Sequence, residues 1–424
     1  MRPLALVLAL ALALPACAPP PRPPVPWAPI RTPDAEEVET VILLVGDGGD
    51  ALPGRSPTLA RVREEVETWS ALLAHDSAVV VIYLGDIVYP VGIHAPGTPQ
   101  YVEDVRHADV QVDVVTGPEG MRHGARAYFL AGNHDWGLSE GVDGVERLLN
   151  LERYLRLRRA EGAGVELAPL AGDPGPVVVD VGQHTRLVLF DTAWWLLGPD
   201  EVRQDRMIHG LHAALGTAGR RHTILGAHHP WESAGSHAGL VSFWETLGIR
   251  FLLSRSGALL QDLDSGPYRR LRDRMRRVFS RTGPPLIYAG GHDHSLQALA
   301  ARDSLEPRYM LVSGAASKLT QVGWTEGMDF AVAKPGYMRL MVRKDGGVDL
   351  FVEATAEDYL KCPGEEGPRQ ECMEAGRRAF GTVFSAHLTP VTAGENLAPA
   401  PGPVDAPDAP PDTAAPPDTA SARR

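Results

Sequence analysis

The chain has 424 residues, of which 44% are hydrophobic, and a formal net charge of −12. The length and apolar content are those of a globular protein with one large domain or two ordinary ones. The excess of acidic residues disfavours nonspecific binding to nucleic acid, so we expect no nucleic-acid partner.

The N-terminal end has the pattern of a signal peptide, expected to cover residues 1–16. Arg2 precedes an apolar run from Leu4 to Leu14, which is too short to cross a membrane as a mature helix. The run leads to Cys17, as in a bacterial lipobox, where the cysteine becomes the lipidated first residue. The pattern predicts an exported bacterial lipoprotein of the cell envelope, anchored in a membrane and facing the periplasm or the outside. A plain secretory signal, removed together with Cys17, is the alternative.

Three further segments lie outside the main domain. Residues 17–38 are rich in proline and predict an extended polyproline spacer. Residues 389–424 contain mostly Pro, Ala, Asp and Thr, so we expect a disordered tail. The extension at 356–388 holds Cys362 and Cys372, which in an exported protein favour a local disulfide. A metal site is the weaker alternative, because no other cysteine or paired histidine lies beside them.

The main domain is expected at 39–355, and its first elements alternate strand, helix and strand. Thr40–Gly46 is a buried strand, and Ser56 and Pro57 begin a helix as its cap and first-turn proline. Residues 78–84 form the next strand, which a right-handed crossover makes parallel to the first. Residues 92–125 are expected to be a polar loop. Further strands are expected at 126–131, 177–181, 186–192, 222–227, 285–290, 308–313, 337–343 and 348–354.

Arginine is concentrated in residues 238–283. Part of this segment has the apolar stripe of a helix, formed by Leu271, Met275, Val278 and Phe279. The arginines beside the stripe indicate a solvated helix face, with a lid or patch that attracts an anionic substrate as the alternative. Trp194 and Trp195, further upstream, favour packing at the rim over a platform for substrate.

Five short blocks place glycine beside carboxylate, amide or imidazole side chains at the ends of predicted strands. Because the carboxyl ends of parallel strands meet at one edge of a sheet, these side chains are expected to converge. The blocks are Gly46-Asp47-Gly48, Gly85-Asp86-Ile87-Val88-Tyr89, Gly132-Asn133-His134-Asp135, His228-His229-Pro230 and Gly291-His292-Asp293-His294.

These residue types suit a centre with two metal ions. Phosphate esters are anionic and resist attack by hydroxide; two ions about 3.5–4 Å apart bind the phosphoryl oxygens and lower the pKa of a water. Such a centre needs one bridging carboxylate, hard oxygen donors on one side and imidazole or amide donors on the other. The available donors are Asp47, Asp86, Tyr89, Asn133, His228, His292 and His294.

The blocks and their order resemble the calcineurin-like metallophosphoesterases, and more closely the purple acid phosphatase branch with its tartrate-resistant type. The resemblance spans about residues 40–355. Most of the superfamily has a histidine where this chain has Gly49, and the purple branch instead has a tyrosine three residues after the bridging aspartate, as Tyr89 follows Asp86. The resemblance implies an α/β fold, a four-layer α-β-β-α sandwich of two mixed sheets. It places a dinuclear metal site at the C-terminal ends of the strands.

The resemblance also assigns roles. It implies Fe(III) at the first site and Fe(II), Zn or Mn at the second. The first metal would be held by Asp47, Tyr89 and His294, the second by Asn133, His228 and His292, with Asp86 bridging both. His134 would lie near the leaving group, oriented by Asp135, and His237 matches a second active-site histidine nine residues after the ligand His228. His229 is expected on the opposite face of its strand and is left out.

We therefore expect an acid phosphatase-like enzyme that hydrolyses small phosphate esters, above all monoesters. A phosphodiesterase or nucleotide hydrolase on the same site is the alternative, because substrate choice lies in loops such as 92–125 and 238–283. A hypothesis of another class is a surface-anchored binding module with a vestigial site. The complete set of ligands argues against it.

Overall fold

The structure is a computed structural model that describes residues 28–73, 78–117, 120–121, 125–137, 143–237, 262–356 and 368–389. The signal peptide, Cys17, Cys362 and all but the first residue of the tail therefore lie outside the described residues. In the part of the chain described, no helix is long and apolar enough to cross a membrane.

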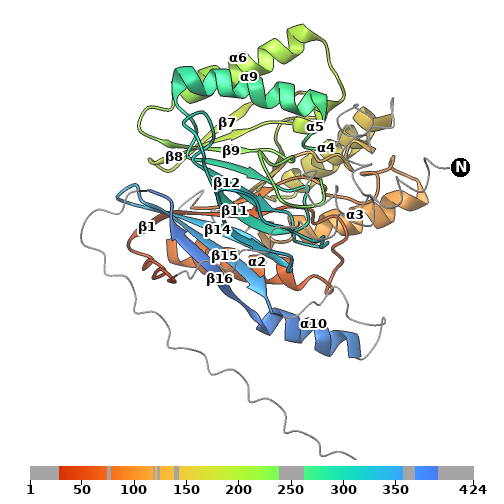
Figure 1. The fold of residues 1–424 in the computed structure, drawn as a ribbon. Helices are drawn as coiled ribbons and strands as arrows, with labels where there is room; N and C mark the ends of the chain where they lie inside the picture. The colour runs from red at the N-terminus through yellow and green to blue at the C-terminus, as the bar shows by residue number, and fades with distance from the viewer. Residues whose placement is uncertain are drawn as a thin grey trace, which may run out of the picture.

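Two seven-stranded sheets form the centre of the molecule (Figure 1). The first has the order β16-β15-β14-β1-β2-β5-β6 and the second the order β13-β11-β12-β10-β9-β8-β7. The first consists of β1 (Val38–Val45), β2 (Val79–Tyr83), β5 (Ala125–Phe129), β6 (Val165–Leu167), β14 (Gly336–Arg343), β15 (Val348–Thr355) and β16 (Phe380–His387). The second consists of β7 (Val177–Val181), β8 (Thr185–Leu189), β9 (His222–Gly226), β10 (Ile287–Gly290), β11 (Leu296–Ala300), β12 (Tyr309–Ser313) and β13 (Met328–Val332).

Helices cover the outer faces of both sheets, so that the molecule has four layers (Figure 1). On the side of the first sheet lie α2 (Pro57–Leu73), α3 (Pro99–Val112) and α10 (Pro368–Arg378). On the side of the second lie α6 (Glu201–Gly216) and α9 (Gly266–Thr282). The remaining elements are α4 (Asp143–Ala160), α5 (Thr192–Leu196) and a small hairpin of β3 (Thr116–Gly117) and β4 (Gly120–Met121). The predicted sandwich of two mixed sheets is confirmed.

Strands β1 and β2, which were predicted to be buried on both faces, are buried on both faces. In β1, Ile42 and Leu44 pack into the core between the sheets, whereas Leu43 and Val45 pack into the core beneath the helices. This alternation follows from the two-residue period of a strand, and it explains why such a strand reads as a continuous apolar run. Parallel pairing of β2 with β1 and β5 brings three strand ends to one edge.

The expectation of a loop at 92–125 is wrong, because the 14-residue helix α3 lies within that segment. Its start follows ordinary capping chemistry: the Thr98 side chain accepts the N–H of Tyr101, and Pro99 occupies the first turn. Its buried face includes the polar Gln111, whose amide donates to the Ile87 carbonyl at 2.7 Å. Polar residues on the buried face conceal the helical period from sequence reasoning.

The C-terminal extension joins the first sheet. Strand β16 pairs antiparallel with β15, and α10 lies on the same side of the sheet as α2. The domain therefore continues past the expected boundary at 355. Cys372 is disulfide-bonded; Cys362 lies outside the described residues, so the pairing of these two cysteines stays a prediction. Strands β11 and β13, which the sequence analysis missed, extend the second sheet beyond β12.

Candidate metal centre

The five blocks follow five strands whose ends meet at one edge of the sandwich. In the first sheet, Asp47, Asp86 and Asn133 follow β1, β2 and β5, which pair in parallel. In the second, His228 follows β9, and His292 and His294 follow β10, again a parallel pair. Parallel pairing explains why residues far apart in sequence arrive at one place, as predicted.

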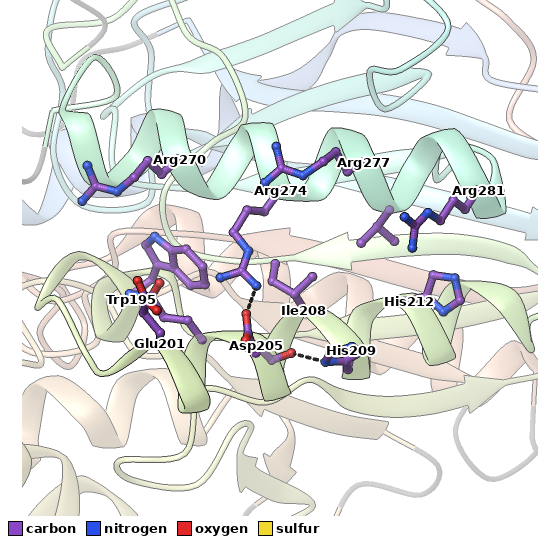
Figure 2. Close-up of a pocket in the computed structure, with 12 residues that line it drawn as sticks. Trp195, Glu201, Asp205, Ile208, His209, His212, Arg270, Arg274, Arg277 and Arg281 are labelled. Carbon is purple, nitrogen blue, oxygen red and sulfur yellow. Dashed lines mark hydrogen bonds and ion pairs between the residues drawn. The ribbon is translucent and has the colours of Figure 1, made fainter.

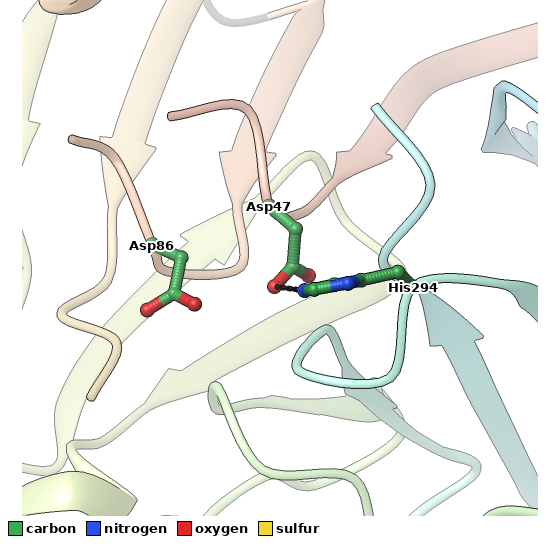
Figure 3. Close-up of side chains that lie close together, drawn as sticks. All are labelled: Asp47, Asp86 and His294. Carbon is green, nitrogen blue, oxygen red and sulfur yellow. Dashed lines mark ion pairs between the residues drawn. The ribbon is translucent and has the colours of Figure 1, made fainter. Parts of the chain in front are cut away.

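The residues expected to hold the first metal lie together. Donor atoms of Asp47, Asp86 and His294 lie within 4.8 Å of one another (Figure 3). The phenol oxygen of Tyr89 lies 3.2 Å from Oδ1 of Asp47 and 3.2 Å from Nε2 of His294. Hard oxygen donors and one imidazole thus converge on a single point, which is a donor set that suits a metal ion.

The residues expected to hold the second metal form an adjoining cluster. Oδ1 of Asn133 lies 2.8 Å from Nε2 of His228 and 3.1 Å from Nδ1 of His292, and these two nitrogens are 3.2 Å apart. Nε2 of His228 also lies 3.5 Å from Oδ1 of Asp86. Asp86 is therefore the residue that lies against both clusters, as a bridging ligand must.

Further contacts orient these side chains. Nδ1 of His228 lies 2.8 Å from the carbonyl oxygen of Leu84, to which it donates, so Nε2 faces the cluster. Hydrogen bonding at one imidazole nitrogen fixes which nitrogen is left to bind a metal. Oδ2 of Asp47 accepts the backbone N–H of His292 at 2.8 Å, and Oδ1 of Asp86 accepts that of His134 at 3.0 Å. The residues thus fit a pair of metal ions in donor type and in orientation.

Backbone strain is concentrated at the same residues. Asp47, Asp86 and His292 have positive φ values of 60°, 55° and 65°, and no other non-glycine residue in the described part of the chain does. Such conformations cost about 1–3 kcal/mol each and persist where the surrounding structure imposes them. A Cβ atom on Gly132 would lie 2.2 Å from the Asp86 carboxylate, and one on Gly291 would lie 2.5 Å from that of Asp47. The block glycines are needed because backbone approaches both carboxylates.

The buried carboxylates and imidazoles of the cluster shift one another's pKa values. Burial acts to raise the pKa of Asp86, but the positive charges of His228 and His134 outweigh it and hold that pKa below its ordinary value. Burial acts to lower the pKa of His228 and of His294, but the Asp86 and Asp47 carboxylates raise both. Bound cations would provide the same compensation for these buried carboxylates.

Two further ligand candidates, His292 and Tyr89, are electrically neutral without metal. Burial and the repulsion of neighbouring histidines, first among them His237, lower the pKa of His292 well below its ordinary value, which favours the neutral imidazole that can bind a metal. Burial and the Asp86 and Asp47 carboxylates raise the pKa of Tyr89 well above its ordinary value, which keeps the phenol protonated. Only a strongly polarising cation displaces that proton.

His134 lies beside the cluster, but Asp135 does not orient it as expected. Nε2 of His134 is 3.9 Å from Oδ2 of Asp86, and its Nδ1 lies 2.7 Å from the carbonyl oxygen of Pro90. The buried Asp135 carboxylate instead accepts backbone N–H groups, at 2.8–3.2 Å, from Ile87, Val88 and Gly132. Burial and the Asp86 charge raise the pKa of Asp135 to about 7. Asp135 shapes the loop that presents Asp86.

His237 reaches the second cluster from the other side. Its ring centroid lies 4.2 Å from that of His292, and its Nδ1 lies 3.2 Å from Oδ1 of the buried Asp262. Oδ1 of Asp293 accepts its backbone N–H at 3.0 Å. The structure therefore brings this histidine to the centre, where its nine-residue spacing from His228 had suggested it.

Sequence reasoning missed Lys318. Its Nζ lies 3.3 Å from the centroid of the Tyr89 ring and 3.3 Å from Oδ2 of Asp50. The neighbouring Ser317 hydroxyl donates to the Asp47 carbonyl at 2.5 Å and ties the two loops together. A signal did exist, because Gly314 to Lys318 follow β12, which is parallel to β10 and ends at the same edge.

His229 is also closer to the centre than expected. Its ring centroid lies 4.3 Å from that of His292, and its Nδ1 lies 2.9 Å from the hydroxyl of Thr192. Trp194 and Trp195 lie in α5, the helix that begins at Thr192. Both side chains are buried, which favours a packing role over a platform for substrate.

The sandwich of two seven-stranded sheets is similar in fold to solved structures. A solved structure described as "GAP50 the anchor in the inner membrane complex of Plasmodium" is similar over 84% of this chain and 90% of that one, with a TM-score of 0.50 and 12% identity. A purple acid phosphatase from yellow lupin (Lupinus luteus) seeds, PPD1, has a TM-score of 0.45 and 15% identity over 76% of this chain and 52% of that one. No protein-family model and no curated protein sequence matches the chain.

Proposed function

We propose that the protein is a hydrolase of phosphate esters, acting above all on monoesters, that uses two metal ions. The observation that carries this proposal is the position of Asp86, whose carboxylate lies against both donor clusters. Shared carboxylates of this kind hold two ions close enough to act on one phosphoryl group. The donors Asp47, Tyr89 and His294 would hold one ion, and Asn133, His228 and His292 the other.

The tyrosine among the donors favours Fe(III) at the first site, because phenolate is a hard anionic ligand that suits a trivalent ion. The second site, with two imidazoles and an amide, suits Fe(II), Zn or Mn. When bound, the two ions supply Lewis-acid polarisation of the phosphoryl oxygens and a water of lowered pKa.

The chain's own groups would position the substrate around this centre. His134 lies beside Asp86 with its Nδ1 held by Pro90, so its Nε2 is directed to the centre and can donate a proton to the leaving oxygen. His237 and Lys318 lie on either side and would hold the phosphoryl oxygens by charge-assisted hydrogen bonds.

The test combines metal analysis with turnover of two generic substrates. We expect the purified protein to contain about two metal ions per chain and to hydrolyse an aryl phosphate monoester faster than the matching bis-aryl diester. Faster turnover of the diester would support the alternative, a phosphodiesterase. Bound metal without turnover of either compound would contradict the proposal of catalysis.

A second candidate function is a binding or anchoring protein without turnover. The likeness in fold to GAP50, whose description names an anchor, favours this candidate. The buried, mutually oriented donor set weighs against it, because nothing in an anchor requires strain at Asp47, Asp86 and His292. The substrate test above distinguishes the two candidates directly.

We further propose that the protein is exported and lipid-anchored through Cys17. The support is the apolar run followed by that cysteine and a Pro-rich spacer. Cys17→Ser should move the protein from the membrane fraction to the soluble fraction or stop its processing. Unchanged fractionation and an unchanged mature mass would refute the anchor.

A further inference from the structure

A groove runs between α6 and α9 on the outer face of the second sheet (Figure 2). Its volume is about 590 Å³, within the range of small-molecule sites. None of the residues that line it belongs to the metal centre or to its flanking groups. Ile208, Val278 and Trp195 contribute its apolar part. The groove is thus a separate feature of the surface.

One wall of the groove is a row of guanidinium groups from α9. Arg270, Arg274, Arg277 and Arg281 line it, spaced four, three and four residues apart. Residues at such spacings lie on one side of a helix, and eleven residues rise about 16 Å. The row can therefore contact an extended anion at several points.

Within the described residues, three of these four arginines make no ion pair or hydrogen bond. Arg274 forms an ion pair with Asp205 of the opposite wall and lies over the Trp195 ring. Arg270, Arg277 and Arg281 are exposed and make no hydrogen bond or ion pair within the described part of the chain.

The other arginines of α9 are engaged elsewhere. Arg276 pairs with Asp303 at 2.6 Å, Arg272 donates to the Trp231 carbonyl at 3.0 Å, and Arg269 donates to the carbonyl of Asp264. The unsatisfied positive charge of this helix is therefore concentrated in the groove and not spread around its surface.

The opposite wall of the groove, formed by α6, carries fewer charged groups than the arginine row. It presents the imidazoles of His209 and His212 together with the carboxylates of Glu201 and Asp205. Nδ1 of His209 lies 2.8 Å from the carbonyl oxygen of Asp205, so its Nε2 is left for another partner. Four arginines against two carboxylates leave the groove with a surplus of two positive charges (4 − 2), on a chain whose formal net charge is −12.

We infer that the α6–α9 groove binds a small anion that carries several phosphate groups, such as a short polyphosphate chain. Guanidinium groups bind phosphate oxygens through paired hydrogen bonds, and a row of them favours a linear, multiply charged ligand over orthophosphate. The volume suits such a molecule and not a folded macromolecule. This site is independent of the metal centre and does not require that the protein be a phosphatase.

The test is calorimetric titration of the full-length protein with inorganic tripolyphosphate. The test variant carries Arg270→Gln, Arg277→Gln and Arg281→Gln together. The matched control carries Arg206→Gln, Arg220→Gln and Arg308→Gln, which removes the same charge at exposed positions outside the groove. We expect affinity to fall at least about tenfold in the test variant and less than about twofold in the control. Orthophosphate should bind at least about tenfold more weakly than tripolyphosphate.

Asp86→Asn separates this site from the metal centre. Tripolyphosphate affinity that survives in Asp86→Asn and falls in the test variant supports the groove, whether or not the protein hydrolyses phosphate esters. Affinity lost in Asp86→Asn but kept in the test variant would assign the anion to the metal centre and overturn the inference. Equal losses in test and control variants, or no binding by wild type, would also overturn it. If the triple variant fails to fold, single Arg277→Gln and Arg281→Gln should each weaken binding severalfold, and unchanged affinity in both refutes the site.

Discussion

Oδ2 of Asp47 accepts the backbone N–H of His292 at 2.8 Å, although 245 positions separate the two residues in sequence. Asp47 follows β1 of the first sheet, and His292 follows β10 of the second. Both residues have positive φ, so a strained backbone on each sheet is held by a contact with the other. The candidate metal centre is therefore assembled only when the two sheets pack together.

The bridging carboxylate is the first test of this arrangement. Asp86→Asn should reduce bound metal from about two ions to one or none and abolish turnover of an aryl phosphate, because a neutral amide bridges two cations poorly. Mass-spectrometric metal analysis and a turnover assay measure the two effects. Asp50→Asn, on the same edge but exposed, is the matched control and should keep its metal. Full metal occupancy with normal turnover in Asp86→Asn would refute a two-metal centre.

His134 should act on substrate and not on metal. His134→Ala is expected to keep both ions but to lose about 10²–10⁴-fold in kcat, the range usual for a general acid. His184→Ala, which removes a partly exposed histidine that pairs with Glu39 and belongs to neither donor cluster, should leave kcat unchanged. Loss of metal from His134→Ala would mean that this side chain is itself a ligand.

Tyr89 tests the likeness to the purple branch. Its phenol oxygen lies 3.2 Å from both Asp47 and His294, so phenolate bound to Fe(III) should give the iron-loaded protein a visible charge-transfer band. Tyr89→Phe should lose the band and keep the fold, because only one oxygen is removed. Tyr83→Phe, which removes another buried phenol oxygen, should keep it. A colourless, fully iron-loaded wild type would refute a Tyr89 phenolate bound to Fe(III).

Asp191 should make stability depend on pH. Burial raises its pKa from 3.8 to about 6, while the Trp194 N–H and the Trp136 indole N–H oppose the shift. The folded state therefore retains the proton longer than the unfolded state, so this stabilising contribution is complete below about pH 4 and is lost as the pH rises through 6. The stability of Asp191→Asn relative to wild type should rise by up to about 3 kcal/mol between pH 4 and 7 in urea unfolding. A difference that is constant over this range would contradict the prediction.

Arg339 should be essential to the packing of α2 on the first sheet. This buried guanidinium lies 2.6 Å from Glu65 of α2 and 3.0 Å from Glu353 of β15. Arg339→Met removes the guanidinium that lies between two buried carboxylates, of which Glu65 keeps Arg61 at 3.1 Å, and should cost about 3–5 kcal/mol in urea unfolding. Adding Glu65→Gln and Glu353→Gln should recover most of that loss. A cost below about 1 kcal/mol for the single variant would show that the carboxylates find other partners.

Local sequence was sufficient for the strands that are buried on both faces. Continuous apolar runs predicted β1 and β2, and the crossover rule predicted that Asp47 and Asp86 would share an edge. The five blocks predicted donor side chains at the strand ends, and the structure adds that Gly132 and Gly291 lie against the Asp86 and Asp47 carboxylates. Buried strands and the blocks at their ends can be predicted from sequence because each depends on residues that are close together in the chain.

Elements whose stability depends on contacts with distant segments could not be predicted from the sequence. The polar Gln111 on the buried face of α3 conceals the helix, because its partner, the Ile87 carbonyl, follows another strand. Strand β16 is stabilised by pairing with β15 and not by an apolar run of its own. In both cases the signal lies in a contact between segments.

The sequence by itself determined which donors this protein has and which strand carries each to the common edge. Only the tertiary structure decided that Pro90 and not Asp135 orients His134, that Lys318 lies over Tyr89, and that four arginines of α9 line one groove. The physical reason is range: hydrophobic period and glycine placement act over a few residues, whereas the partner of a hydrogen bond or a charge is chosen by the packing of whole elements.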